Sequence, residues 1–161
     1  MRWRNSKYAG IENHYLALSL RCISCCNGGM KTSSFYLYDG PGRISIARTA
    51  PRRVKAGFKL YRPLNPGAWR SEPAYQQHEA YRERYFREVL GPLDPQRVWD
   101  ELHRLAGGDE PVLLCHEHLL KSGDWCHRRL VAEWFAARLD VDVPELQTEK
   151  HRARDAQLPL F

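Results

Sequence analysis

A short apolar run at residues 111–117 constrains the fold of this chain more than any other feature. Pro111-Val-Leu-Leu-Cys115 carries no charge, so it predicts a strand that is buried on both faces, as in a parallel sheet. Asp94 and Pro95 begin an amphipathic stretch before it, in the positions of an N-cap and a first helical residue, and Gly107-Gly108 ends that helix. A buried strand directly after such a helix is typical of an α/β fold.

The remaining segments supply the other elements of this fold. Strand character at residues 32–38 and polar–apolar alternation at 43–48 predict two strands, and a last short strand is expected at 141–146. Helical signals begin at Ser71 and continue to Leu90, and a further helix is expected from Trp125 to Leu139, capped by Asp124. The order predicts a three-layer α/β domain at residues 30–148, with a mostly parallel sheet and flanking helices.

The two ends of the chain differ from this central region. Residues 1–29 show no sustained period and end in Gly28-Gly29, so we expect an extension that packs poorly on the domain. Residues 149–161 are charged as far as Asp155 and predict a flexible tail. No apolar run approaches the roughly 20 residues that cross a bilayer, and the five cysteines lack the spacing of a secreted disulfide framework. We therefore expect a cytoplasmic protein without a membrane partner.

The net charge of +6 is concentrated in one segment. Between Asp39 and Glu72 there is no acidic residue but eight Lys or Arg residues, so the rest of the chain is net −2 (6 − 8). A basic segment on a nearly neutral body is typical of a surface that binds phosphate, although it is also compatible with a solvated loop. We predict that DNA is bound by Arg48, Arg52, Arg53, Lys55 and Lys59.

Two cysteines mark the predicted reactive site. Cys115 lies near the carboxyl end of its strand, and Cys126 lies in the first turn of the following helix. Ligands of open α/β sheets bind beyond the carboxyl ends of the strands, and the free N–H groups of a helix start favour an anion or a thiolate. The predicted catalytic residues are Cys126 as nucleophile or redox centre, Cys115 as its partner, His127 as acid or base and Arg128 as anion clamp.

Three other interpretations of these residues stay open. Cys115 can be a small core residue, Cys126 and His127 can pack or cap the helix, and both cysteines can bind zinc together with a histidine. The gap between the cysteines is long for a zinc knuckle, so we assign no metal and no cofactor. Cys22 and Cys25 have a better metal spacing, but they lie in the expected extension.

Three sequence blocks resemble one known family. The blocks Ile44–Pro51, Pro111–Glu117 and Trp125–Trp134, which contains Cys126-His127-Arg128, are similar to the signature of the family called domain of unknown function 488. The likeness covers roughly residues 30 to 146. It implies an α/β fold and a pocket that contains both cysteines, His127 and Arg128, but it implies no settled activity.

The last five residues resemble a peptide that binds the bacterial sliding clamp. Gln157-Leu158-Pro159-Leu160-Phe161 has a glutamine followed by Leu-x-Leu-Phe. The amide of Gln157 both donates and accepts hydrogen bonds, and Leu158, Leu160 and Phe161 supply apolar anchors for a groove. The alternative is a tail whose last residues dock on the core of their own domain. We predict that Gln157, Leu158, Leu160 and Phe161 bind the clamp.

These features predict a protein of DNA repair or modification that is tethered to the sliding clamp and carries a cysteine-based anion-binding site. One alternative is a non-catalytic clamp-binding adaptor or inhibitor with structural cysteines. Another is a cysteine-dependent cytoplasmic enzyme that acts on free nucleotides. The sequence does not identify the reaction.

Overall fold

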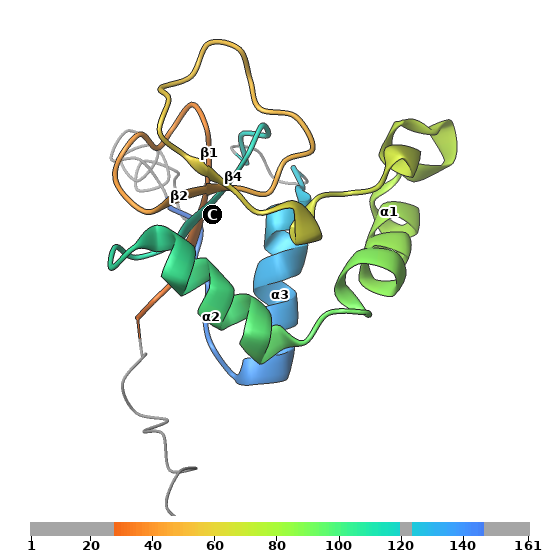
Figure 1. Cartoon of the computed structure of the whole chain (residues 1–161). Helices are drawn as coiled ribbons and strands as arrows, with labels where there is room; N and C mark the ends of the chain where they lie inside the picture. Colours follow the sequence, from red (N-terminus) through yellow and green to blue (C-terminus); the bar gives the residue numbers. More distant parts are fainter. Residues whose placement is uncertain (1–27, 120–123, 147–161) are drawn as a thin grey trace, which may run out of the picture.

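The computed structural model describes residues 28–119 and 124–146 (Figure 1). Its strands are β1 (Lys31–Ser34), β2 (Arg43–Ser45), β3 (Lys59–Leu60) and β4 (Val112–Cys115). Its α-helices are α1 (His78–Tyr85), α2 (Pro95–Ala106) and α3 (His127–Leu139). Short 3-10 helices lie at Arg62–Leu64, Ala68–Ser71 and Pro73–Tyr75, and a π-helical turn at Phe86–Leu90 continues α1.

The four strands form one sheet in the order β1-β4-β2-β3, and every pairing is parallel. The predicted α/β class with a parallel sheet and flanking helices is therefore confirmed. The apolar run at 111–117 contains β4, which lies between β1 and β2 and is buried along its whole length. A strand with partners on both edges and no water on either face needs apolar side chains throughout, which explains its composition.

The two faces of the sheet are covered differently. Leu113 of β4 belongs to the larger core cluster, together with residues of α2 and α3 such as Leu102 and Val131. Both helices lie on this face in Figure 1. The side chains of Val112 and Leu114 point to the opposite face, because successive residues of a strand alternate. There they join a smaller cluster whose other members, in the described residues, come from loops and element ends.

Local sequence signals explain the bounds of α2. Asp94 is its N-cap, and its carboxylate accepts a hydrogen bond from the backbone N–H of Arg97 at 2.7 Å. Pro95 occupies the first helical position, where its missing N–H costs no hydrogen bond. Gly107 ends the helix in the left-handed conformation, with φ 70°. The predicted start and end of this helix are confirmed.

The first two strands are shorter than predicted, since β1 ends at Ser34 and β2 at Ser45, and three further predicted elements differ in kind or bounds. The helix expected from residue 71 is interrupted, since 3-10 segments precede α1 and a π-helical turn follows it. The strand expected at 141–146 is reduced to a single parallel bridge between Glu145 and Thr32. The helix that begins after Trp125 has Cys126, not Asp124, as its N-cap. Cys126 therefore lies at the boundary of α3 rather than in its first turn.

The start of the expected domain is well packed, since Met30 is fully buried in the larger core cluster. Most of the expected extension, residues 1–27, and the tail with the pentapeptide at 157–161 lie outside the described residues. In the part that the structure describes, none of the helices has the length and apolar character that a membrane span requires.

Candidate functional site

The predicted reactive residues lie together at the carboxyl edge of the sheet. Cys115 is the last residue of β4, and Cys126 directly precedes α3. Both side chains, with His127, line a cavity of about 290 Å³. Cys115 and Cys126 are only 2% and 3% exposed, so their sulfurs are reached through this cavity rather than from the open surface. Cys126 is therefore shielded from bulk solvent, although the sequence predicts it as a nucleophile.

His127 is centred between the two sulfurs. Its Nδ1 atom lies 3.7 Å from the Sγ of Cys115 and 3.7 Å from the Sγ of Cys126. Its other ring nitrogen, Nε2, lies 3.0 Å from the backbone carbonyl oxygen of Ile46. A carbonyl oxygen accepts but cannot donate, so Nε2 carries the proton. In the neutral ring, Nδ1 is then left with a lone pair directed at the cysteines.

Glu117 completes the cluster, although it was given no role from the sequence. The thiols of Cys115 and Cys126 donate to the same carboxylate oxygen, Oε2, at 2.9 and 3.0 Å. Glu117 is exposed as a residue, yet this oxygen reaches both buried sulfurs. Its position two residues after Cys115, at the carboxyl end of a predicted central strand, was the signal that could have identified it.

The pKa values of the two thiols shift in opposite directions. A hydrogen bond to Cys126, followed by burial, raises the pKa of Cys115. Burial also raises the pKa of Cys126, but the hydrogen bond from Cys115 and the neighbouring His127 and Arg128 outweigh it and lower that pKa overall. Burial likewise opposes ionisation of Glu117, but the hydrogen bonds from both thiols lower its pKa to about 2. Cys126 is therefore the more acidic of the two thiols.

Arg128 has a different position from the one that an anion clamp requires. Its side chain is fully buried, and its Nε and Nη2 atoms bind the Glu145 carboxylate, with Nη2 at 2.8 Å from Oε1. It is absent from the residues that line the cavity. Arg128 therefore acts on Cys126 through its buried charge, while it fixes the segment after α3 to the helix.

Two other arginines line the cavity instead. Arg48, which follows β2, and Arg70 both border the space beside the thiols, and both are exposed at its mouth. Arg48 is one of the predicted DNA-binding residues, whereas Arg70 is another of the eight cations between Asp39 and Glu72, to which the sequence assigned no role. Aromatic side chains of Tyr75, Tyr81 and Trp125 complete the wall. The cavity thus combines cationic groups, which suit an anion, with flat apolar surfaces, which suit an aromatic ring.

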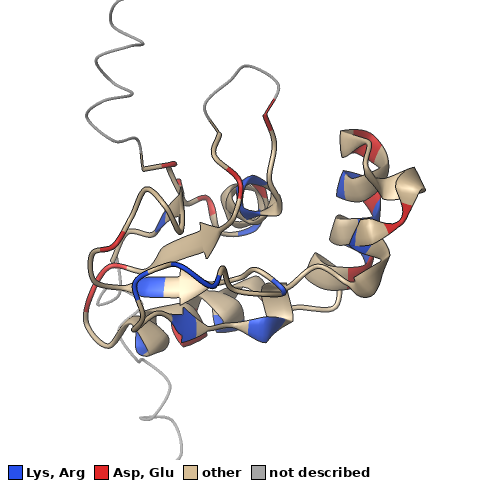
Figure 2. Cartoon of the chain, turned by 90° about the horizontal axis from the view of Figure 1, so that it is seen from above, with Lys and Arg blue, Asp and Glu red and all other residues tan. Residues whose placement is uncertain are grey.

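The predicted DNA-binding residues all lie on exposed positions. Arg48, Arg52, Arg53, Lys55 and Lys59 are exposed, and Figure 2 shows this stretch of ribbon without any acidic position. Arg43 fixes this loop to the start of β2. Its side chain is 8% exposed and donates hydrogen bonds to the backbone carbonyls of Lys55 and Ala56. A buried cation thus organises the loop, while its other cations are left on the surface.

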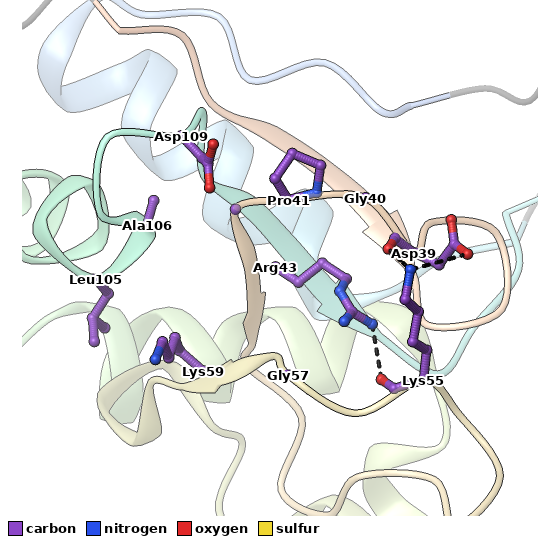
Figure 3. Close-up of a pocket in the computed structure, with 11 residues that line it drawn as sticks. Asp39, Gly40, Pro41, Arg43, Lys55, Gly57, Lys59, Leu105, Ala106 and Asp109 are labelled. Carbon is purple, nitrogen blue, oxygen red and sulfur yellow. Dashed lines mark hydrogen bonds and ion pairs between the residues drawn. The ribbon is translucent and has the colours of Figure 1, made fainter.

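A second cavity lies at the opposite, amino edge of the sheet (Figure 3). It has a volume of about 400 Å³ and includes Lys55 and Lys59 from the predicted DNA-binding set. Figure 3 shows Lys55 bonded to Asp39, and Asp109 lies on the far wall. The nitrogen of Lys55 lies 3.7 Å from the Asp39 carboxylate. Acidic and basic groups therefore offset one another here, and no thiol or histidine lines this space.

Comparisons with known proteins identify no relative of this chain. No family model, no curated protein and no solved structure matches it. The resemblance of its sequence blocks to the family called domain of unknown function 488 stays a prediction.

Proposed function

We propose that the protein works in DNA repair or modification, held at the bacterial sliding clamp by residues 157–161, and acts through its cysteine site on a nucleotide unit. The observation that carries this proposal is the composition of the 290 Å³ cavity. Its inner wall holds two thiols, a histidine and a carboxylate, and its mouth holds Arg48 and Arg70. Reactive groups beside an anion-binding mouth suit a phosphorylated substrate.

The aromatic wall narrows the substrate class. Tyr81 and Trp125 have ring centroids 4.8 Å apart, and Trp69 packs against Tyr75 and Tyr81 from behind. Rings held in this way form a rigid surface on which a nucleobase can stack. The volume is at the small end of ligand cavities, which are roughly 300–1,000 Å³, and this favours one nucleotide over a longer segment.

The basic loop supports DNA as the source of that nucleotide. Arg48 belongs both to the loop and to the cavity wall, so a backbone bound along the loop leads into the cavity. Arg52 and Arg53 are exposed further along the same loop. Phosphate contacts of this kind supply affinity without sequence preference.

The cavity assignment is tested with a short single-stranded DNA. Arg70→Ala removes a cation from the mouth, and we expect it to weaken binding about 10- to 100-fold, as loss of a charged hydrogen bond does. Arg138→Ala, which removes an exposed cation from α3, is the matched control. Equal affinities of the two variants, measured by fluorescence anisotropy, would exclude the cavity as the binding site.

The clamp assignment is tested separately. Replacing Leu160 and Phe161 with Ala removes the apolar anchors, so we expect binding of purified sliding clamp to weaken by about 2–4 kcal/mol. His151→Ala changes the same tail outside the pentapeptide and serves as the control. Surface plasmon resonance with immobilised clamp gives both constants. If the double variant binds as tightly as the control, the tail is not a clamp peptide.

The burial of both cysteines supports a second candidate function. Sulfurs that are 2% and 3% exposed are also compatible with structural residues, as in a non-catalytic clamp-binding adaptor. An adaptor retains all its binding properties in the Cys126→Ser variant, provided that the variant folds. Loss of a DNA-dependent activity in that variant, with clamp binding unchanged, would favour the enzyme.

A further inference from the structure

Four potential metal-donor atoms converge on one point at the cavity wall. The sulfurs of Cys115 and Cys126 and a ring nitrogen of His127 all lie within 4.8 Å of one another. Oε2 of Glu117 lies 2.9 and 3.0 Å from the same two sulfurs. All four residues line the cavity, so a small ligand in the cavity can reach them.

The distance from His127 to each of the two sulfurs matches the geometry of tetrahedral zinc. Zinc binds thiolate sulfur at about 2.3 Å and imidazole nitrogen at about 2.0–2.1 Å, so two such ligands at a tetrahedral angle lie roughly 3.6 Å apart. The distance from Nδ1 of His127 is 3.7 Å to each sulfur. The two sulfurs lie within 4.8 Å of each other, so the three atoms are close enough together to bind one ion.

The orientation of His127 is that of a metal ligand. The hydrogen bond of Nε2 to the Ile46 carbonyl fixes the ring and leaves Nδ1 as the nitrogen with the lone pair in the neutral ring. Ligand histidines are commonly held by such a bond between the second ring nitrogen and a backbone carbonyl. Soft thiolates together with an imidazole favour zinc over magnesium or calcium, which prefer oxygen ligands.

The geometry points to a zinc ion bound by Cys115, Cys126 and His127, with its fourth position open to the cavity beside Glu117. The Glu117 oxygen lies closer to the sulfurs than the roughly 3.5 Å expected between two zinc ligands. We therefore assign Glu117 to the neighbourhood of the fourth position and not to the metal itself. Three protein ligands with one open position are typical of a catalytic zinc site, whereas structural sites have four.

The zinc site deepens the proposed function. Only the reaction class given to the site rests on that proposal; the binding of the metal does not. A water at the fourth position would have a lowered pKa, and the Glu117 carboxylate lies where it can accept the proton of that water. The cysteine site would then be hydrolytic, with both thiols as ligands and neither as nucleophile. Metal binding itself requires neither DNA nor the clamp, so the two proposals can fail separately.

The test uses the full chain in which Cys22, Cys25 and Cys26 are replaced by Ser, because those cysteines could bind metal themselves. This protein is reduced, incubated with Zn²⁺ and freed of excess metal, and its zinc content is measured by mass spectrometry. We expect about one equivalent, falling to less than about 0.1 in the further variants Cys115→Ser and Cys126→Ser. Glu117→Gln should retain about one equivalent, since it leaves all three ligands intact.

Two further measurements test the site without relying on variants that could fail to fold. Co²⁺ in place of Zn²⁺ should give the visible absorption of a tetrahedral ion and a thiolate-to-metal charge-transfer band. Bound Zn²⁺ should also protect Cys115 and Cys126 from iodoacetamide in the otherwise unchanged protein, as mapped by peptide mass spectrometry.

Absence of zinc from the reduced protein, or unchanged zinc in both cysteine variants, would overturn the site. Loss of zinc in a folded Glu117→Gln variant would overturn the three-ligand arrangement.

Discussion

Arg128 and Glu145 form an ion pair that joins α3 to the segment after it. The Arg128 side chain is fully buried, the Glu145 side chain is 19% exposed, and two guanidinium nitrogens bind the carboxylate. The same carboxylate accepts a hydrogen bond from the Thr32 hydroxyl at 2.6 Å. One acidic side chain thus connects the last described segment to both α3 and β1.

Removing the charge of Glu145 should destabilise the protein strongly. Glu145→Gln leaves the Arg128 cation buried without a counter-charge, which typically costs about 3–5 kcal/mol in the free energy of unfolding. Glu83→Gln breaks the exposed pair with Arg87, whose side chains are 80% and 59% exposed, and should cost less than about 1 kcal/mol. Urea denaturation measures both variants, and similar losses would show that the buried pair contributes no more than a surface pair.

The pair of Tyr61 and Glu101 should make stability depend on pH. The Tyr61 hydroxyl donates to the Glu101 carboxylate at 2.6 Å, and this bond, followed by one from Arg97, lowers the pKa of Glu101 below its usual 4.5. Because the pKa of Glu101 is lower in the folded than in the unfolded protein, the ionised carboxylate stabilises the fold above about pH 4.5. This stabilisation is lost as the pH falls through the folded-state pKa. Tyr61→Phe should therefore lower the free energy of unfolding more at neutral pH than in acid. Denaturation at several pH values checks this, and a difference independent of pH would contradict it.

The basic loop should control the salt dependence of DNA binding. If Arg52 and Arg53 each contact a phosphate, the slope of log affinity against log salt should become shallower by about 1 for each replacement with Ala. Arg138→Ala should leave the slope unchanged, because α3 lies outside the loop. Titrations of duplex DNA at several salt concentrations give the slopes. Identical slopes for all variants would remove the loop from the DNA interface.

Two glycines with the same backbone conformation should respond differently to alanine. Gly42 and Gly107 have φ 69° and 70°, a left-handed conformation that costs an alanine about 1–2 kcal/mol. A Cβ at Gly107 would meet no atom within 4 Å, whereas one at Gly42 would overlap the Glu110 carbonyl oxygen. Gly42→Ala should therefore lower the free energy of unfolding by about 1–3 kcal/mol more than Gly107→Ala. Thermal denaturation of both variants compares them, and equal losses would show that the turn relaxes freely.

Sequence patterns predicted the central elements well because their signals are local. These signals act within a few residues, so they can be recognised in the sequence without knowledge of the tertiary structure. They are the cap at Asp94, the left-handed Gly107 and the apolar run of β4. Strand β3 was missed because it has only two residues, both exposed, and two residues show no period. It forms only because Lys59 and Leu60 meet the edge of β2, which is a tertiary contact.

The candidate site was predicted in part for a similar reason. Cys115, Cys126 and His127 were found because strand ends and helix starts meet in an α/β fold. The partner of Arg128 could not be predicted from the sequence, because Glu145 reaches Arg128 only when the last described segment pairs with β1. Arg70 was identified as part of the basic segment, but only the packed structure brings it to the cavity mouth.

The sheet order has a consequence for synthesis of the chain. β1 and β2 leave the ribosome first, but neither pairs with the other, since both bond to β4. At about 5–20 residues per second, roughly 70 residues separate the end of β2 from the end of β4, so both strands wait several seconds without their central partner. During this interval their unpaired backbone edges are open to other chains. A nascent-chain chaperone is therefore expected to bind while residues 46–111 are being made.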